Sequence, residues 1–362
     1  MQIIGEKNAE KEKNSCIFQI FLVILQAELK NMKIAFTTEL PREGFRRLVE
    51  RGIGDLSLVI GDCDDKSWKE ADVLVSTFDY KVSREMIEGM PKLQLIANFG
   101  AGYNNIDLEA CRERGIRVTN TPQPVIEPTA ELAFALMMAV SRRIVEFDKK
   151  LRVESLELRE VGKSKEESLF GVMRNLSHSL YGKTLGILGM GRIGQALARR
   201  AKASGMRILY HNRHQINDDA LKALNGGNDE MVKYVDFQTL LQDSDFVSLN
   251  LPYTPDVHHI IGKPELGMMK RSAYLINTAR GAHVDEAALV EALRSGIIAG
   301  AAMDVYEHEP QITPDLLTLP NVVLSPHTGT GTWEGRIAMC ECVTDNILAF
   351  IDNEFNKMNI VL

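Results

Sequence analysis

Short apolar runs alternate with stretches of helical periodicity from residue 33 onward. The first set of such runs comprises residues 33–37, 72–76, 93–98 and 117–120, with a helical pattern at residues 42–51. A strand that is apolar at nearly every position is buried on both faces, as in parallel sheets whose strands are joined by crossover helices. The pattern predicts a small α/β layer of roughly ninety residues.

The alternation restarts at residue 183. Its strand-like runs comprise residues 184–188, 207–211, 246–249, 273–277, 299–303 and 322–324. Six strands with helical patterns between most of them predict a doubly wound sheet. A later helical stretch, residues 334–354, most easily packs back on the first layer. We therefore predict an α/β protein with two doubly wound parallel-sheet domains, the second inserted within the first, joined by two crossings with a cleft between them.

Two segments between these layers have patterns of their own. The pattern of residues 129–144 predicts a helix that is apolar on nearly every face. Such a helix must be buried on all sides, so we expect it between domains or between subunits, and a homodimer is the resulting hypothesis. Residues 151–181 have mixed charge and no clear period, and we expect a loop with some helix.

The chain begins with a segment that does not fit the alternation. Its apolar run, residues 17–25, is too short to span a membrane, which takes ~20 residues. A signal peptide would have a basic segment before this run and a small-residue cleavage site after it, and the sequence matches neither pattern. Because residues 32–36 resemble a first strand, we expect residues 1–31 to be an N-terminal extension outside the fold.

Composition and charge exclude several classes of protein. A chain of 362 residues with 45% hydrophobic and 25% charged residues is typical of a globular protein of two domains. The net charge is −7 and no basic run is present, which argues against nucleic acid as a partner. Five scattered cysteines are expected to be reduced thiols of a cytoplasmic protein: Cys16, Cys63, Cys111, Cys340 and Cys342.

No metal site is predicted. The cysteines form no C-x-x-C pair and have no histidine at ligand spacing. His258 and His259 are interpreted as loop or helix-start residues whose side chains point in different directions, and therefore not as a metal pair.

A glycine-rich motif follows the first strand of the second layer. Gly189, Gly191 and Gly194 match G-x-G-x-x-G, with Arg192 and Ile193 between the last two. The strand at 184–188 runs into the motif and a helix at 195–204 leaves it, which is the setting of a dinucleotide-binding turn. There the glycines let backbone approach a pyrophosphate, and the helix N-terminus offers N–H groups to the phosphates.

The end of the next strand bears on the choice of dinucleotide. In this motif an acidic residue about twenty positions on binds the adenosine ribose hydroxyls. Here that strand ends in Asn212 and Arg213, and no carboxylate precedes Asp218. Arg213 suits a 2′-phosphate, so we predict that NADP is preferred over NAD.

The chain resembles the D-isomer-specific 2-hydroxyacid dehydrogenases from about residue 32 to residue 349. Four landmarks carry the resemblance in the family's order: GAGYNNID at 100–107, the glycine motif, NTARG at 277–281 followed by Val284 and Asp285, and DVYEHEP at 304–310 before SPH at 325–327. The resemblance implies an NAD(P)-dependent oxidoreductase acting on a 2-keto acid or its D-2-hydroxy acid. It implies a Rossmann NAD(P)-binding domain at 123–327, inserted within a smaller flavodoxin-like substrate-binding domain at 32–122 and 328–362.

Three residues would carry the chemistry. Arg280 follows a strand end, where ligands bind in open α/β sheets, and its planar fork suits a carboxylate; by resemblance it is the family's substrate arginine. His327 matches the general acid for reduction and base for oxidation, a role that suits a side chain with an ordinary pKa of ~6.5. Glu309 matches the carboxylate that pairs with this histidine and favours its charged form.

The resemblance also implies further contacts. Asp304 would face the nicotinamide side of the cofactor. The loop of Gly100, Ala101, Gly102 and Tyr103 would offer backbone N–H groups to the substrate carboxylate. Other predicted cofactor neighbours are Thr129, Pro252, Thr254 and Thr278.

Alternatives remain open at this point. A dinucleotide-sensing corepressor-like binding protein, or a phosphite-type dehydrogenase on the same scaffold, would keep the same residues, whereas a formate dehydrogenase is expected to have Gln in place of Glu309. Residues 151–181 lack the tryptophan that family members commonly carry there. Small substrates such as glyoxylate or hydroxypyruvate are supported only by the predicted NADP preference.

Overall fold

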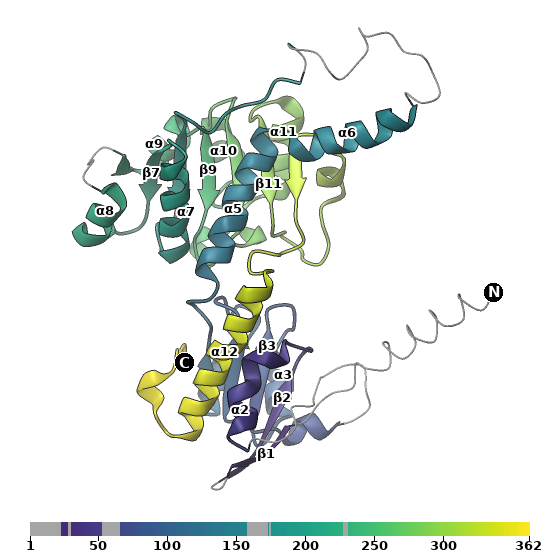
Figure 1. Ribbon diagram of the computed structural model, residues 1–362, viewed down its shortest axis with the longest axis vertical. Helices are drawn as coiled ribbons and strands as arrows, with labels where there is room; N and C mark the ends of the chain where they lie inside the picture. Colours follow the sequence, from purple (N-terminus) through teal and green to yellow (C-terminus); the bar gives the residue numbers. More distant parts are fainter. Residues whose placement is uncertain (1–22, 28–29, 53–65, 158–172, 174, 227–230) are drawn as a thin grey trace, which may run out of the picture. The chain divides into compact units, whose positions relative to one another are not determined.

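The computed structural model describes residues 23–27, 30–52, 66–157, 173, 175–226 and 231–362, and the chain divides into two compact units. Unit 1 comprises Met1–Val125 and Thr330–Leu362, and unit 2 comprises Ile126–Gly329. Figure 1 shows the course of the chain through both. Unit 2 is therefore one continuous insertion. Its ends lie at residues 126 and 329, beside the predicted crossings at 123 and 327; which unit binds which ligand stays a prediction.

Unit 1 is built on a sheet with the strand order β1-β2-β3-β4-β5 among the described residues. Strands β2 (Lys30–Phe36), β3 (Val73–Thr77), β4 (Leu95–Phe99) and β5 (Arg117–Thr119) are parallel. Every residue of β3 and β4 is buried, which explains their uninterrupted apolar sequence. The helical elements of this unit are η1 (Arg42–Phe45), α2 (Arg46–Glu50), η2 (Lys66–Glu70), α3 (Arg84–Glu88), α4 (Leu108–Glu113), α12 (Trp333–Ile351) and η7 (Phe355–Lys357).

Helix α12 returns to unit 1, as predicted for residues 334–354. It packs against β4 and η1, and the Thr344 hydroxyl donates a hydrogen bond to the Gly44 carbonyl at 2.8 Å. Gly44 allows this approach, because a Cβ there would lie 2.2 Å from the Cβ of Cys340.

The N-terminal segment differs from the expectation. Strand β1 (Val23–Ala27) pairs antiparallel with β2, so part of residues 1–31 joins the sheet. Its sequence, VILQA, supplies the apolar and β-branched residues that favour a strand. The prediction that residues 1–31 lie outside the fold therefore fails for β1 and for the first residues of β2. Residues 1–22, 28 and 29 lie outside the described residues.

Unit 2 is built on a sheet with the order β12-β11-β10-β9-β6-β7-β8 in the described part of the chain. All neighbouring strands are parallel. They are β6 (Thr184–Leu188), β7 (Arg207–His211), β8 (Val232–Tyr234), β9 (Phe246–Leu249), β10 (Tyr274–Asn277), β11 (Gly300–Met303) and β12 (Val322–Leu324). The strand order reverses between β6 and β9, and ligands of doubly wound sheets bind beyond the strand ends at such a point.

Helices cover both faces of this sheet and enclose two apolar cores (Figure 1). The helical elements are α5 (Ile126–Ser141), α6 (Ile144–Glu157), α7 (Arg192–Ala203), α8 (Asp218–Asn225), α9 (Phe237–Asp243), η4 (Pro255–Val257), α10 (Lys263–Met268), η5 (Gly281–His283), α11 (Glu286–Ser295) and η6 (Pro314–Thr318). Helix α5 packs on β10, β11, β12 and α7. The sheet of its own unit covers one face of this helix, and Met138 is 40% exposed in the single chain. The expectation that the helix is buried between domains or between subunits stays a prediction.

The described residues contain no helix long and apolar enough to cross a membrane. Three cysteines fall within the described ranges, Cys111, Cys340 and Cys342, and none is in a disulfide. Cys16 and Cys63 lie outside the described residues. Of residues 151–181, α6 accounts for the first seven, and residues 158–172 and 174 also lie outside the described ranges.

Candidate active site

The glycine motif forms the turn between β6 and α7. Gly189 has a φ of +99°, and a Cβ there would lie 2.7 Å from the Asn250 carbonyl oxygen. A Cβ on Gly194 would lie 2.3 Å from the Gly189 oxygen. A Cβ on Gly191, in contrast, would meet nothing within 4 Å. The fold itself thus requires glycine at 189 and 194, whereas at 191 a bare backbone leaves open space of the kind a pyrophosphate needs.

The first turn of α7 borders this open space. Gly191 is the N-cap of the helix and has no side chain to accept a hydrogen bond from the first N–H groups. Arg192 and Ile193 are the first helical residues. Asn212 stabilises the turn from the end of β7, because its Oδ1 accepts a hydrogen bond from the Met190 N–H at 2.6 Å. The uncapped N–H groups and the helix dipole make this turn suitable for a phosphate.

Arg280 follows β10 in a turn organised by Asn277. The Asn277 side chain is fully buried; it donates to the Arg280 carbonyl at 2.9 Å and accepts from the Ala279 N–H at 3.0 Å. The next residue, Gly281, lies against the backbone of Tyr306, where a Cβ would be 1.9 Å from the carbonyl carbon. This close approach brings the turn that carries Arg280 beside the segment that carries Glu309.

His327 and Glu309 form a direct pair. The His327 Nδ1 lies 2.7 Å from Glu309 Oε2, and the other oxygen, Oε1, accepts the Tyr306 N–H at 2.9 Å. The two side chains remain 25% and 33% exposed, so a small ligand can reach them. With Nδ1 bonded to the carboxylate, Nε2 is the atom of His327 that can exchange a proton with a ligand.

Asp304 holds the segment that carries His327. Its side chain is 1% exposed and accepts hydrogen bonds from the Ser325 hydroxyl at 2.6 Å and from the N–H groups of Thr328 and Gly329, both at 2.8 Å. The His327 backbone has a φ of +51°, and its N–H donates to the Asp304 carbonyl at 2.8 Å. These contacts mean that Asp304 positions the segment that carries His327. That Asp304 also faces the nicotinamide stays a prediction.

The charges of the three predicted catalytic residues act on one another. Burial alone would raise the pKa of Glu309, but the His327 hydrogen bond and charge, the Tyr306 N–H and the Arg280 charge together bring the pKa of this carboxyl below its usual value. Burial lowers the pKa of Arg280, and the charge of Glu309 opposes this effect. Glu309 is therefore ionised near neutral pH and can stabilise a charged imidazole.

The remaining predicted cofactor residues lie in unit 2. Thr278 is 8% exposed, and its hydroxyl has no hydrogen-bond partner among the described residues, so it suits a polar group of a ligand. Thr129 on α5 lies beside Gly329. Pro252 is exposed, and Thr254 is the N-cap of η4. Arg213 is exposed, and the hydrogen bond from Thr254 and the charge of Arg213 both help to lower the pKa of Asp256.

The predicted substrate loop lies in unit 1, after β4. The carbonyl oxygens of residues 100, 101 and 102 accept hydrogen bonds from Thr121, Asn120 and Asn98 at 2.8 to 3.0 Å. Within the described residues, the N–H groups of residues 101–103 have no such partner. The side chain of Tyr103 is 37% exposed. This backbone arrangement suits a carboxylate acceptor.

The sequence prediction missed several residues that support the site. Glu286 on α11 is 2% exposed and accepts the Glu307 N–H at 2.8 Å. His283 is fully buried, and this burial lowers its pKa to about 4, so its ring is neutral near pH 7. Asn277 belongs to a quoted motif but had no predicted role. An acid at the N-terminus of a helix and a histidine among apolar residues are too common to have indicated these roles.

One interpretation of the sequence is corrected here. The side chains of His258 and His259 do not point in different directions: their rings stack with centroids 4.0 Å apart and planes at 19°. The reason is the backbone of His259, whose φ of +50° turns the chain so that two consecutive side chains share a side.

Comparison with known proteins identifies the family. The family model for the NAD binding domain of the D-isomer specific 2-hydroxyacid dehydrogenases matches residues 134–329 of this chain. The chain belongs to this family. A glyoxylate reductase of Thermococcus litoralis is 48% identical over 286 residues, which are 79% of this chain and 82% of the relative. As a member of the D-isomer specific 2-hydroxyacid dehydrogenases, the protein is an NAD(P)-dependent enzyme that transfers a hydride between 2-keto acids and 2-hydroxy acids.

Solved structures of 2-hydroxyacid dehydrogenases share its architecture. The crystal structure of a glyoxylate reductase from Paecilomyes thermophila is 34% identical with a TM-score of 0.74, covering 91% of this chain and 97% of that one. The NADPH-dependent glyoxylate/hydroxypyruvate reductase of Sinorhizobium meliloti, solved with NADP and malonate, is 30% identical with a TM-score of 0.71, covering 88% and 93%. The predicted α/β architecture with a Rossmann domain is thereby confirmed.

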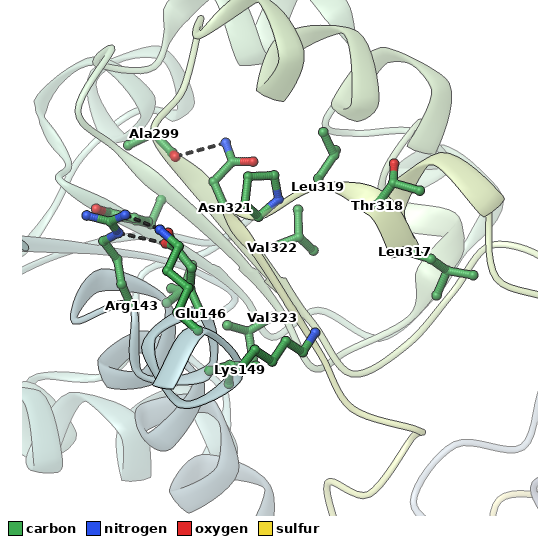
Figure 2. A pocket seen from close by; sticks show the side chains of 15 residues that line it. Arg143, Glu146, Lys149, Ala299, Leu317, Thr318, Leu319, Asn321, Val322 and Val323 are labelled. Carbon is green, nitrogen blue, oxygen red and sulfur yellow. Dashed lines mark hydrogen bonds and ion pairs between the residues drawn. The ribbon is translucent and has the colours of Figure 1, made fainter. Parts of the chain in front are cut away.

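A pocket of about 340 Å³ lies elsewhere in this 2-hydroxyacid dehydrogenase, between α6 and residues 317–323 (Figure 2). Glu146 accepts hydrogen bonds there from Arg143 and Lys150, both at 2.6 Å. The Arg143 hydrogen bond is the main cause that lowers the pKa of Glu146 to about 2. None of the predicted site residues lines this pocket.

Proposed function

We propose that Arg280, Glu309 and His327 carry out the reaction of this dehydrogenase on a small 2-keto acid. The observation that supports this most directly is the 2.7 Å contact between His327 and Glu309, with the charge of Arg280 acting on the same carboxylate. All three follow strands at the carboxyl edge of the unit 2 sheet, the edge that also carries the glycine turn.

Each residue has a separate task in this mechanism. Arg280 binds the carboxylate of the 2-keto acid through its planar fork and orients the carbonyl. His327 donates the proton on Nε2 to the carbonyl oxygen during reduction and removes it during oxidation. Glu309 holds Nδ1 and stabilises the imidazolium. Asp304 keeps the histidine in place through the segment 325–329.

We propose that the turn at residues 189–194 holds the dinucleotide pyrophosphate, with Thr129, Pro252, Thr254, Thr278 and Asp304 as further cofactor neighbours. The bound dinucleotide supplies or accepts the hydride. The open space at Gly191, the uncapped start of α7 and the unpartnered Thr278 hydroxyl all fit such a ligand. The N–H groups of residues 101–103 are proposed as additional partners of the substrate carboxylate, whereas the Gly100 N–H already donates to the Asn98 carbonyl at 3.0 Å.

Glyoxylate and hydroxypyruvate are the proposed substrates, because relatives that are named as reductases of these acids align with most of this chain. The test is a spectrophotometric panel in which NADPH and NADH are each combined with glyoxylate, hydroxypyruvate, pyruvate, 2-ketogluconate and branched 2-keto acids. The two small acids are expected to have the highest kcat/KM. Trace rates with every acid, together with tight dinucleotide binding, would contradict the catalytic proposal.

We further propose that NADPH is preferred over NADH, and that Arg213 binds the 2′-phosphate. The variant Arg213→Ala is expected to lower kcat/KM for NADPH by about 10–100-fold, the value of a charge-assisted contact, with little change for NADH. Arg271→Ala is the matched control, because Arg271 is an exposed arginine before β10, at the opposite end from the carboxyl ends of the strands. A wild-type enzyme with higher efficiency for NADH would contradict the proposal.

A homodimer formed through α5 and α6 is proposed as the assembled state. Ile144, Leu151 and Val153 are 43–58% exposed on α6, which extends away from the sheet of unit 2 (Figure 1). Light scattering at micromolar concentration is expected to give twice the chain mass of 40.4 kDa. The double variant Ile144→Glu/Leu151→Glu is expected to be monomeric. The control Val49→Glu alters an exposed apolar residue of unit 1 and is expected to remain dimeric. A monomeric wild type would exclude this interface.

A further inference from the structure

A cluster of metal-ligating side chains lies in unit 2 outside the proposed catalytic residues. It consists of His258, His259 and Glu307, whose ligand atoms all lie within 4.8 Å of one another. The two histidines follow η4, and Glu307 follows Tyr306 on a separate segment. His259 Nε2 lies 2.6 Å from Glu307 Oε1. We propose that this cluster is a binding site for a divalent transition-metal ion.

The ligand types decide which ions fit. Two imidazoles and one carboxylate are the ligands of Zn²⁺, Co²⁺ or Ni²⁺, whereas Mg²⁺ and Ca²⁺ prefer sites made of oxygen atoms. Three protein ligands leave at least one position for water, which suits a site at the surface. The expected ion is therefore Zn²⁺ or an ion of similar preference.

The backbone segments that carry His259 and Glu307, and the ring of His258, are held by their surroundings. The His259 N–H donates to the Ala282 carbonyl at 2.8 Å, and the Glu307 N–H donates to Glu286 at 2.8 Å. The hydroxyl of Tyr253 lies 3.3 Å from His258 Nδ1. A partner on one ring nitrogen, such as Tyr253 on His258, fixes the orientation of a metal-binding imidazole and leaves the other ring nitrogen for the ion. In His258 that nitrogen is Nε2.

Binding requires the ligand atoms to rearrange. A tetrahedral ion at ~2.0–2.2 Å from each ligand atom places these atoms ~3.3–3.6 Å from one another. His258 is exposed and can rotate inward by about an ångström, and the His259 and Glu307 ligand atoms, now 2.6 Å apart, must separate by somewhat less than that. The proton between His259 and Glu307 is released to solvent when the ion takes its place. The ion would then link the segment after η4 to the segment that leads to Glu309.

The test uses tag-free protein that has been treated with a chelator. Calorimetry with Zn²⁺ is expected to show a site with one ion per chain, and Co²⁺ should develop the visible absorption of a low-coordinate site. Saturating Zn²⁺ should raise Tm by about 2–5 °C, since an ion that binds only the folded state stabilises it. Both His258→Ala and Glu307→Gln should weaken Zn²⁺ binding by at least about 10-fold.

The matched control is His308→Ala. His308 is an exposed histidine of the same segment as Glu307 and is not a member of the cluster, so its loss should leave the affinity unchanged. The absence of stoichiometric Zn²⁺ binding to the wild type would overturn the proposal. So would an affinity that survives in His258→Ala, a variant that changes only a surface side chain, or one that falls equally in His308→Ala.

Discussion

Replacing His327 with alanine is expected to lower kcat for reduction of the 2-keto acid by about 10²–10⁴-fold, the usual contribution of general acid catalysis. The proton donor is lost, whereas the glycine turn and Arg280 are unchanged. The dissociation constant of the dinucleotide should therefore remain near the wild-type value. Stopped-flow or steady-state absorbance of the reduced nicotinamide measures the rate, and fluorescence titration measures binding.

Glu309→Gln is expected to lose less rate than His327→Ala, because an amide still accepts a hydrogen bond at Nδ1 but no longer stabilises the imidazolium by charge. His308→Ala serves as the control, since this exposed histidine lies next to Glu309 and outside the pair. A larger loss in Glu309→Gln than in His327→Ala would reverse the assigned roles, with the carboxylate rather than the imidazole as the principal proton donor.

Replacing Arg280 with lysine is expected to lower kcat/KM for the 2-keto acid by about 10²–10³-fold, although the charge is kept. A guanidinium holds a carboxylate through two parallel hydrogen bonds, and an ammonium acts as a single point charge. Arg280 is also partly buried, where a poorly matched charge costs more than at the surface. Steady-state kinetics with varied 2-keto acid should show the change largely in KM.

The control for this variant is Arg294→Lys. Arg294 lies on α11 and forms an exposed ion pair with Asp315 at 2.6 Å, so the substitution should leave kcat/KM within about twofold of the wild type. If Arg280→Lys, like Arg294→Lys, kept the wild-type KM for the 2-keto acid, Arg280 would have a structural role. Other residues would then bind the carboxylate of the substrate.

Much of the fold is predictable from the chain because its central strands, such as β6 and β9, are buried on both faces. The prediction placed β6, β7, β9 and β12 at their observed bounds, since each is a short apolar run between turn residues. It missed β8, which has three residues and only Val232 buried, so its pattern is too short to recognise. It also missed β1, which pairs at the edge of its sheet.

The site was predictable where local sequence determines it, and not where distant residues meet. The glycine turn was predicted from a short pattern in its expected setting, and Arg280, Glu309 and His327 from the motifs of the family; their roles stay predictions. Contacts between segments far apart in the chain leave no such pattern: Glu286 holds Glu307 from 21 positions away. The same holds for His259 and Glu307, which are 48 residues apart and were therefore not recognised as a cluster.

The three glycines of the turn after β6 are required for different reasons. Positions 189 and 194 are fixed by architecture, since any side chain there would collide with neighbouring backbone. The folded chain leaves room for a side chain at position 191, so glycine is required there only by the proposed pyrophosphate. A descendant of this enzyme that had abandoned its nucleotide would keep the first two glycines in order to fold, and mutations would accumulate first at the third.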